Sequence, residues 1–271
     1  MGFGEKLRGA AERNGSLLCV GLDPHPDRVA TDDLIPFLRA IIDATSDLVC
    51  AFKPQLAFFE VRGAAGWEAL HATVDAIPRN VPIILDAKRG DIGSTATAYA
   101  EMAFDLVGAD AVTVNPYLGH DAALPFLTRP DRAAFFLCRT SNPGGDDLQS
   151  LDVDGQPLYQ RVADLVRQWG EPHGNAGLVV GATYPEELAA VRQRCPDVPI
   201  LLPGIGAQGG DLDRSLAAGL DARGGGLIVS ASRSVLFAST GSDFADAARA
   251  EAEQLRRAIQ QSAAARPAQQ H

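Results

Sequence analysis

The sequence predicts an α/β fold, a single (β/α)8 TIM barrel that spans residues 1–271. Eight short runs of apolar and β-branched residues recur along the chain. Most runs are continuous rather than alternating, as expected for parallel strands that are covered on both faces. Segments with the apolar spacing of amphipathic helices separate the runs, which is the pattern of a βα barrel. No linker divides the chain, and barrels of about 250 residues commonly form one domain.

The predicted strands are each followed by turn residues or polar side chains. They cover residues 17–22, 48–52, 82–85, 111–114, 133–138, 177–180, 199–202 and 226–229. Helical spacing is clearest in residues 34–42, 158–169 and 244–259. A short N-terminal helix over residues 5–13 should cover one end of the barrel, and residues 262–271 are expected to form a frayed, flexible tail. The longest stretch without periodicity, residues 140–156, is a candidate lid or substrate-binding loop.

Composition and charge exclude several classes of ligand and location. The formal net charge of −10 argues against a general surface for nucleic acid or for anionic membranes. No apolar run approaches the roughly 20 residues of a membrane span, and residues 1–6 lack a signal-peptide core, so we expect a cytoplasmic protein. The cysteines and histidines lack the spacing of metal ligands, so no metal site is predicted. The four cysteines are expected to be buried, reduced thiols.

Charged residues follow the second and third predicted strands, where barrel enzymes carry their chemistry. Lys53 follows the second strand, and Asp86, Lys88 and Asp91 follow the third. Side chains two apart on a strand share a face, so Asp86 and Lys88 should point the same way, whereas Gly90 lets the chain redirect Asp91. Only three of the 24 basic residues are lysines. Because lysine can give up a proton near neutral pH and arginine cannot, Lys53 and Lys88 are candidates for chemistry.

A phosphate site is predicted at the ends of the last two strands. Glycines within residues 204–210 permit close backbone approach, and Arg233 can supply a fork of charged donors. Loops in these positions hold phosphate in many barrels. Plainer interpretations stay open. The glycines could form ordinary turns, Asp23 could shape a turn instead of contacting a sugar hydroxyl, and Lys53 with Asp86 could be a structural ion pair.

The run LDAKRGDIGSTA at residues 85–96 resembles the signature of the orotidine 5′-phosphate decarboxylase family, particularly its second bacterial subfamily. The segments FKPQ at residues 52–55, TSNP at 140–143 and PGIGAQ at 203–208 extend the resemblance over nearly the whole chain. The resemblance implies a cofactor-free loss of CO2 from orotidine 5′-monophosphate to give UMP. This reaction is the last step of pyrimidine nucleotide synthesis.

The resemblance also implies roles for individual residues. Lys88 would protonate C6 and stabilise the developing carbanion, with Asp86 beside the scissile carboxylate. Lys53 would hold Asp86 and a ribose hydroxyl. Asp91, with Ile92 and Thr95, would complete the site of a partner subunit, which makes a homodimer with shared active sites obligatory for activity. The other implied substrate contacts follow strand ends and are Asp23 at the ribose, Ser141 at the pyrimidine, Pro203 and Gln208 in the seventh loop, and Ser232 and Arg233 at the phosphate.

The chain departs from the family pattern at two places. Ser232 stands where many relatives have glycine, and the fifth loop is longer around residues 144–152, which leaves the roles of Asn115 and Asn142 open. The nearest rival is a magnesium-dependent sugar-phosphate synthase or decarboxylase of the same barrel group, in which an acidic residue commonly replaces the strand-two lysine. A Schiff-base aldolase that uses Lys88 and a non-catalytic nucleotide-phosphate-binding barrel are further alternatives.

Overall fold

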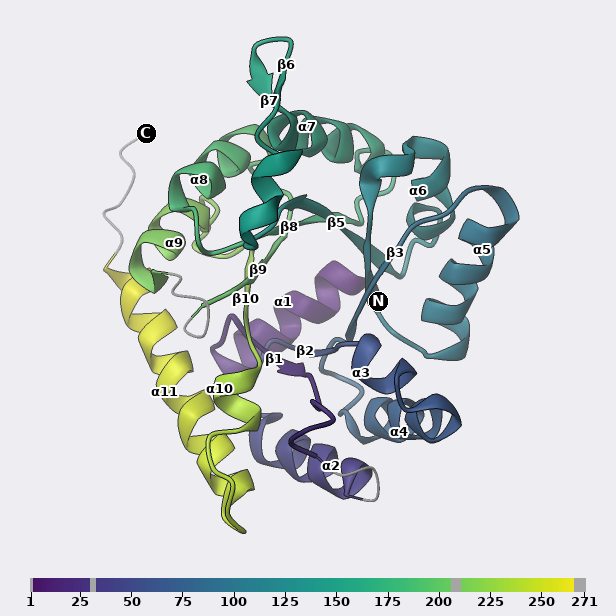
Figure 1. The fold of residues 1–271 in the computed structure, drawn as a ribbon. Helices are drawn as coiled ribbons and strands as arrows, with labels where there is room; N and C mark the ends of the chain where they lie inside the picture. The colour runs from purple at the N-terminus through teal and green to yellow at the C-terminus, as the bar shows by residue number, and fades with distance from the viewer. Residues whose placement is uncertain (1, 30–32, 206–210, 266–271) are drawn as a thin grey trace.

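Eight parallel strands form the centre of the computed structural model, which describes residues 2–29, 33–205 and 211–265 (Figure 1). The strands are β1 (Leu18–Leu22), β2 (Ala51–Pro54), β3 (Ile84–Arg89), β4 (Ala111–Val114), β5 (Ala133–Arg139), β8 (Ala176–Val180), β9 (Ile200–Pro203) and β10 (Leu227–Ala231). Their order in the sheet is β2-β1-β10-β9-β8-β5-β4-β3. The parallel bridges Phe52 to Ile83 and Gln55 to Asp86 join the two outer strands. The sheet therefore closes on itself, and the predicted barrel is confirmed.

Each predicted strand overlaps an observed one, and the differences of most consequence concern β2 and β3. β2 begins at Ala51 rather than at residue 48, and β3 continues to Arg89 although its apolar run ends at Leu85. Pairing with β4 thus continues past the hydrophobic run. The lysines that were expected to follow these two strands lie within them. They are therefore held by the barrel rather than by loops.

Helices surround the barrel and cover the outer face of its strands (Figure 1). The α-helices of the described residues are α1 (Phe3–Asn14), which lies apart from this ring, and α2 (Leu34–Thr45), α3 (Ala57–Glu60), α4 (Gly63–Ala76), α5 (Gly93–Glu101), α6 (His120–Leu127), α7 (Leu158–Gly170), α8 (Pro185–Arg194), α9 (Leu212–Gly219), α10 (Arg233–Leu236) and α11 (Phe244–Ala264). Buried side chains recur at helical spacing, such as Leu38 and Ile42 of α2. Helix α11 continues to Ala264, so the first three residues of the segment predicted as a tail from about residue 262 are helical. Residues 266–271 lie outside the described residues.

Helix α1 lies across the end of the barrel that is opposite the carboxyl ends of the strands (Figure 1). Phe3 meets Phe135 edge to face, with ring centroids 5.6 Å apart. Lys6 Nζ donates to Asp110 Oδ2 at 2.7 Å, which ties the helix to the start of β4. The predicted N-terminal helix over one barrel end is therefore confirmed. Lys6, the one lysine that was not a candidate for chemistry, has a structural contact.

The fifth loop contains structure that the sequence interpretation missed. It forms a 3-10 helix, η3 (Pro143–Asp147), and a hairpin of β6 (Asp152–Val153) and β7 (Gln156–Pro157). Asp154 and Gly155 both have positive φ, at 54° and 84°. Asp-Gly is the usual sequence for such a two-residue hairpin turn. The dipeptide was a usable signal, but strands of two residues are too short to produce a recognisable apolar period.

The buried guanidinium of Arg139, the last residue of β5, anchors this loop. It forms ion pairs with Asp146 of η3, at 2.7 Å, and with Glu187 of α8. The backbone N–H of Thr140 donates to Gln149 Oε1 at 2.8 Å. A buried cation needs such paired partners because leaving water is costly. The contacts fix the path of the chain where it leaves β5.

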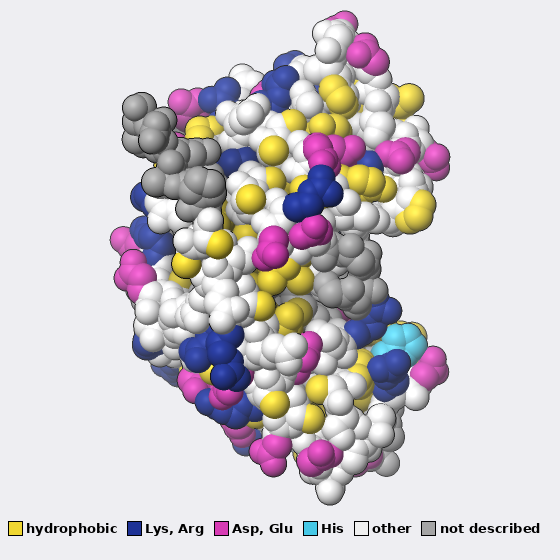
Figure 2. All heavy atoms as spheres, turned by 90° about the vertical axis from the view of Figure 1, so that its left-hand side faces the viewer, with side chains coloured by type: hydrophobic (Ala, Val, Ile, Leu, Met, Phe, Trp, Pro, Cys, Tyr) yellow, Lys and Arg dark blue, Asp and Glu magenta, His cyan; other side chains and the backbone are white. Residues whose placement is uncertain are grey.

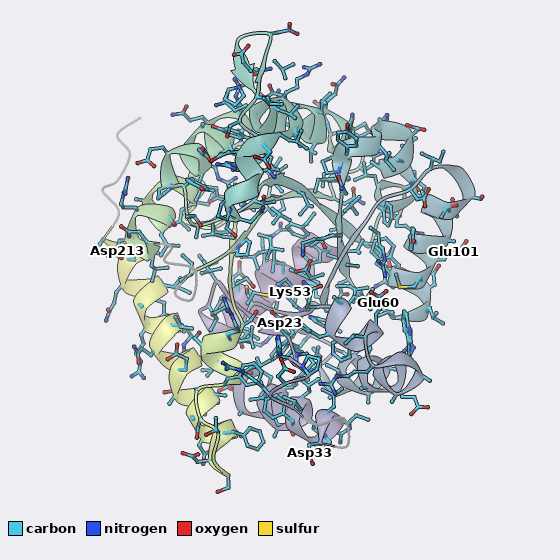
Figure 3. The ribbon with its side chains drawn as sticks, viewed as in Figure 1. Asp23, Asp33, Lys53, Glu60, Glu101 and Asp213 are labelled. Atoms are coloured by element: carbon cyan, nitrogen blue, oxygen red, sulfur yellow. The ribbon has the colours of Figure 1, made fainter. Side chains whose placement is uncertain are left out.

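The outer surface agrees with the charge distribution expected from composition. On the face shown in Figure 2, acidic and basic side chains are interspersed rather than gathered into one large basic area. Figure 3 places Lys53 and Asp23 inside the ring of helices, whereas Asp33, Glu101 and Asp213 lie at its periphery. Within the described ranges, no helix has the length and apolar character needed to cross a membrane. All four cysteines are buried and free, as predicted.

Candidate active site

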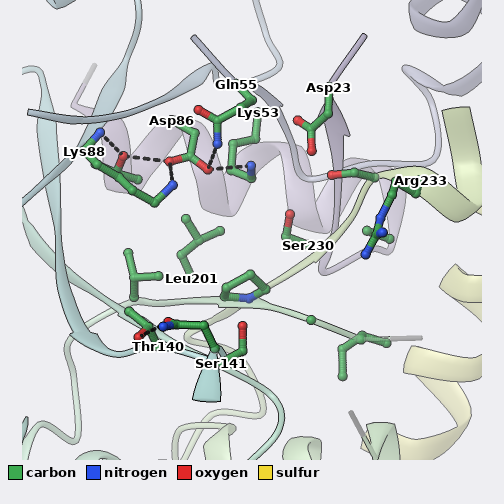
Figure 4. Close-up of a pocket in the computed structure, with 18 of the residues that line it drawn as sticks. Asp23, Lys53, Gln55, Asp86, Lys88, Thr140, Ser141, Leu201, Ser230 and Arg233 are labelled. Carbon is green, nitrogen blue, oxygen red and sulfur yellow. Dashed lines mark hydrogen bonds and ion pairs between the residues drawn. The ribbon is translucent and has the colours of Figure 1, made fainter. Parts of the chain in front are cut away.

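Three charged side chains from two neighbouring strands meet at the carboxyl end of the barrel. Asp86 of β3 accepts from Lys53 Nζ of β2 at 2.8 Å through Oδ2, and from Lys88 Nζ at 2.6 Å through Oδ1 (Figure 4). Lys53 is buried, and Asp86 is only 7% exposed. The side chain of Lys88 is 47% exposed and is the outermost of the three. The arrangement is a cation, an anion and a second cation in one chain of contacts.

Two neutral donors complete the surroundings of Asp86. Gln55 Nε2 donates to Oδ2 at 3.0 Å, and Thr113 Oγ1 donates to Oδ1 at 2.9 Å. Each carboxylate oxygen thus accepts one charged and one neutral hydrogen bond. Hydrogen bonds to the ionised form of a carboxyl favour that form. The four donors therefore hold Asp86 as a carboxylate with little freedom to rotate.

Electrostatics keep these groups charged. Burial by itself disfavours the ammonium of Lys53, but the carboxylates of Asp86 and Asp23 outweigh this effect and raise the Lys53 pKa above its ordinary value. Burial likewise disfavours the Asp86 carboxylate, yet the charges of Lys53 and Lys88 lower its pKa well below the ordinary range. At neutral pH Lys53 and Asp86 therefore carry fixed charges.

The charged cluster forms one end of a cavity of about 320 Å³, and Arg233 lies at the opposite end (Figure 4). Asp23 of the segment after β1 lies along the wall between them. Its Oδ1 atom is buried and has no hydrogen-bond partner among the described residues. Thr140 and Ser141 form part of the facing wall. The cavity thus has a cation at each end and polar groups between, with one carboxylate acceptor left for a ligand.

Apolar side chains form the floor of this cavity. Leu137 of β5, Val179 of β8 and Leu201 of β9 line it beside the charged cluster. An apolar surface next to fixed charges lowers the local dielectric constant, which strengthens their interaction with a bound ion. The floor therefore increases the electrostatic effect of the lysines on any ligand that fills the cavity.

Comparisons with known proteins show the family of the chain. The model of the family described as "Orotidine 5'-phosphate decarboxylase / HUMPS family" matches residues 16–250. The chain belongs to this family. It is 54% identical over 255 residues to orotidine 5′-phosphate decarboxylase of Herpetosiphon aurantiacus, covering 91% of this chain and 94% of the relative. The protein of the same name from Roseiflexus castenholzii is 56% identical, with coverage of 96% and 97%. The structure of Leishmania donovani OMP decarboxylase matches with a TM-score of 0.88 and 43% identity, covering 98% of this chain and 100% of that one.

The structure brings together most of the residues predicted from the resemblance to orotidine 5′-phosphate decarboxylases. Those that line the cavity are Asp23, Lys53, Asp86, Lys88, Ser141, Pro203, Ser232 and Arg233. Asp91, Ile92 and Thr95 are not among the described residues that line it. The expectation that Asp91 joins the two lysines and Asp86 in one cavity is therefore not met within a single chain. Gln208 lies outside the described residues.

Ser232, the departure from the family pattern, packs against β1. A Cβ atom added to Gly21 would lie 1.9 Å from Ser232 Oγ, so the serine fits only because position 21 is glycine. Gly181 has the same role at the facing wall, where an added Cβ would lie 2.8 Å from Ser141 Cβ. These two glycines let the polar walls approach the neighbouring strands closely.

Several cavity residues were not singled out from the sequence of this family member. Gln55 belongs to the FKPQ motif without a predicted role, and Thr113 and the three floor residues lie in predicted strands. Their sequence signal is weak, because Leu, Val and Thr are common in any buried strand. Only the closure of the barrel shows which of them face the cavity.

Proposed function

We propose that the chain converts orotidine 5′-monophosphate to UMP and CO2, the last step of pyrimidine nucleotide synthesis. The observation that carries the proposal is the contact chain Lys53, Asp86 and Lys88 at one end of a cavity whose other end holds Arg233. Membership of the orotidine 5′-phosphate decarboxylase family and the names of the relatives support it. A nucleotide monophosphate with a carboxylate on its base has anionic groups at both ends, which suits a cavity with a cation at each end.

The chemistry follows from the placement of Lys88. When the bond between C6 and the carboxylate breaks, CO2 leaves and the electron pair stays on C6. The pyrimidine offers no good electron sink, so the barrier must fall through fixed charge that suits the transition state. An ammonium about 4 Å from an anion contributes about 4 kcal/mol at an effective dielectric constant of 20. Lys88 then gives a proton from Nζ to C6, which yields UMP, and regains one from water.

Asp86 positions this ammonium. Asp86 accepts hydrogen bonds from both lysines, so its carboxylate holds Lys88 Nζ in place before the substrate arrives. A preorganised charge costs no reorganisation at the moment of reaction. Asp86 also lies beside the place proposed for the substrate carboxylate. Release of CO2 removes a negative charge from that place, so the reaction relieves the repulsion between the two carboxylates.

The remaining polar groups suit the rest of the substrate. The buried Oδ1 of Asp23 can accept a hydrogen bond from a ribose hydroxyl, and Ser141 faces the place of the pyrimidine. Ser232, Arg233 and the backbone near Pro203 lie at the proposed phosphate end. Gln208 is proposed, on the family resemblance, to bridge base and phosphate. Binding energy at the phosphate end can then align the reacting end.

Replacing Arg233 by alanine should raise KM by about 10- to 100-fold with a smaller effect on kcat, because a charge-assisted hydrogen bond contributes roughly 1.5 to 3 kcal/mol. Steady-state kinetics with orotidine 5′-monophosphate measure this effect. Arg257→Ala, at an exposed ion pair of α11, is the matched control and should leave both constants unchanged. Unchanged KM and kcat in the Arg233 variant would remove this residue from the phosphate site.

We further propose a homodimer in which Asp91, Ile92 and Thr95 complete the partner's cavity. The segments after β3 and β4 lie side by side, since a Cβ added to Gly90 would lie 3.2 Å from the carbonyl oxygen of Asn115. These segments expose large apolar side chains, with Ile92 59% and Tyr117 81% accessible. Exposed apolar side chains gathered beside a polar site are typical of interfaces. A partner that covers them would bring its own Asp91 toward this site.

The reaction is proposed to need no metal or organic cofactor. Both oxygens of Asp86 already accept from ammonium groups, so a metal cation would have to displace a lysine to bind there. The strand-two position that the magnesium-dependent rival commonly fills with an acidic residue is Lys53. Cytoplasmic location is likewise a proposal, and the four buried free thiols support a reducing compartment.

Protein treated with EDTA should decarboxylate orotidine 5′-monophosphate as fast as untreated protein, because fixed ammonium charges supply the stabilisation. Loss of the absorbance of the orotate ring measures the rate. Magnesium added back to the treated protein should give no stimulation. Activity that disappears with EDTA and returns with magnesium would favour the sugar-phosphate rival instead.

A further inference from the structure

We infer that Thr113 is a positioning residue that sets the place of the Lys88 ammonium through both the backbone of Lys88 and the carboxylate of Asp86. The inference rests on the proposed decarboxylation and concerns a residue of β4 that does not itself belong to the charged cluster. Thr113 is 1% exposed. Its side chain lines the cavity beside Asp86.

The hydroxyl of Thr113 makes three hydrogen bonds to one short stretch of β3. It donates to Asp86 Oδ1 at 2.9 Å, and it accepts from the backbone N–H groups of Ala87 at 3.0 Å and Lys88 at 2.9 Å. A hydroxyl has one proton to donate and two lone pairs to accept with. All three are used here, so the hydroxyl has no freedom left to reorient.

The strand geometry shows why the backbone needs this hydroxyl. β3 pairs with β4 regularly up to Leu85 opposite Val112, and pairing resumes with Arg89 opposite Val114. Asp86, Ala87 and Lys88 therefore face the single residue Thr113. In a regular parallel ladder only alternate N–H groups of β3 would point to β4, and they would pair with its backbone carbonyls. Here the Thr113 hydroxyl replaces a backbone carbonyl as the acceptor for the N–H groups of Ala87 and Lys88.

This bulge places Lys88 in an unusual conformation. Its φ is 46°, a left-handed value that residues with a Cβ rarely adopt. Such a conformation persists only where surrounding contacts enforce it. In a regular strand a residue two positions from Asp86 would share its face, but the three-residue bulge breaks that alternation. The left-handed turn at Lys88 is what returns its side chain toward Asp86, and the Thr113 hydroxyl holds the N–H of the same residue.

The Lys88 side chain is 47% exposed and its Nζ donates to Asp86 Oδ1 at 2.6 Å, so the place of its head depends on Asp86 and on the backbone of Lys88. Removing the hydroxyl leaves the N–H groups of Ala87 and Lys88 without this acceptor and takes away one of the four donors to Asp86. Arg233 at the far end of the cavity is untouched by the change. Loss of the hydroxyl should therefore reduce the chemical step and leave substrate binding nearly intact.

Thr113→Val, which keeps the side-chain shape, should lower kcat about 100-fold with KM within about twofold, as expected for a reacting group displaced by about 1 Å. Thr113→Ser, which keeps the hydroxyl, should recover kcat to within about fivefold of wild type. Thr73→Val is the matched control, since the buried Thr73 hydroxyl of α4 donates only to Ala69 O, remote from the cavity. The control should keep its kcat although it also loses a buried hydroxyl.

Two further measurements separate positioning from folding. The affinity of Thr113→Val for UMP should match wild type, and its crystal structure should show Lys88 away from φ near 46° or its Nζ withdrawn from Asp86. Unchanged kcat, a KM that rises as much as kcat falls, or an unmoved Lys88 would each overturn the inference. Wild-type protein that fails to decarboxylate orotidine 5′-monophosphate would refute the proposed function, and the crystal structure of the variant would still decide the role of Thr113.

Discussion

Lys88→Ala should lower kcat for orotidine 5′-monophosphate by at least about a thousandfold, because about 4 kcal/mol of charge stabilisation corresponds to nearly three powers of ten in rate. The same change removes the proton donor for C6. Affinity for UMP should change far less, since Arg233 and Asp23 are retained. Single-turnover kinetics with excess enzyme measure the chemical step, and titration with UMP measures binding.

Two lysine variants serve as controls for this experiment. Lys6→Ala removes the lysine that pairs with Asp110 at the opposite end of the barrel, so it should leave kcat unchanged. Lys88→Arg keeps a positive charge but cannot give up a proton near neutral pH, so it should remain severely impaired. A Lys88→Ala variant with kcat near wild type would refute the proposed mechanism, because the reaction would then proceed without the Lys88 ammonium.

The fold was predictable because parallel strands that are buried on both faces appear in the sequence as continuous apolar runs. Each of the eight apolar runs overlaps an observed strand, and the predicted and observed bounds of β4 are the same. The apolar run no longer indicates a strand where that strand leaves the core. β3 carries polar residues through Arg89, and only pairing with β4 shows that these residues still belong to the strand.

The charged part of the site was also predictable, but for a partly wrong reason. Alternation along a regular strand predicts that Asp86 and Lys88 share a face, and they do meet. The strand is not regular there, because its pairing with β4 shifts between Leu85 and Arg89 and Lys88 has a left-handed φ of 46°. No local pattern in the sequence reports a register shift, because the shift depends on a neighbouring strand far along the chain. For the same reason Thr113 could not be distinguished from any other buried threonine.

Asp91 and Ile92 lie away from the cavity of their own chain. Asp91 Oδ1 accepts from the backbone N–H of Ile92 at 2.8 Å. In the sequence, Asp91 lies in the same motif as Asp86 and Lys88. The motif alone does not indicate whether Asp91 acts in its own subunit or in the partner. The proposal of a shared site gives this geometry a function, and it can be tested with two chains that are each inactive.

Mixing Lys53→Ala chains with Asp91→Ala chains should restore about a quarter of wild-type activity after subunits exchange at equal concentrations. Random exchange makes half of the dimers mixed. In each mixed dimer one site receives the intact Lys53 of one chain and the intact Asp91 of the other, while the second site carries both defects. Decarboxylation rates before and after exchange measure the recovery, and mass spectrometry of native dimers verifies the mixed species.

The matched control mixes Lys53→Ala with Asp86→Ala chains. Lys53 and Asp86 contact each other within one chain, at 2.8 Å, so every site in a mixed dimer keeps one of the two defects. This mixture should recover no activity. Recovery in both mixtures would point to reversion or contamination rather than sharing. Absence of recovery with Asp91→Ala, despite verified mixed dimers, would mean that Asp91 acts within its own subunit and that each cavity is complete without a partner.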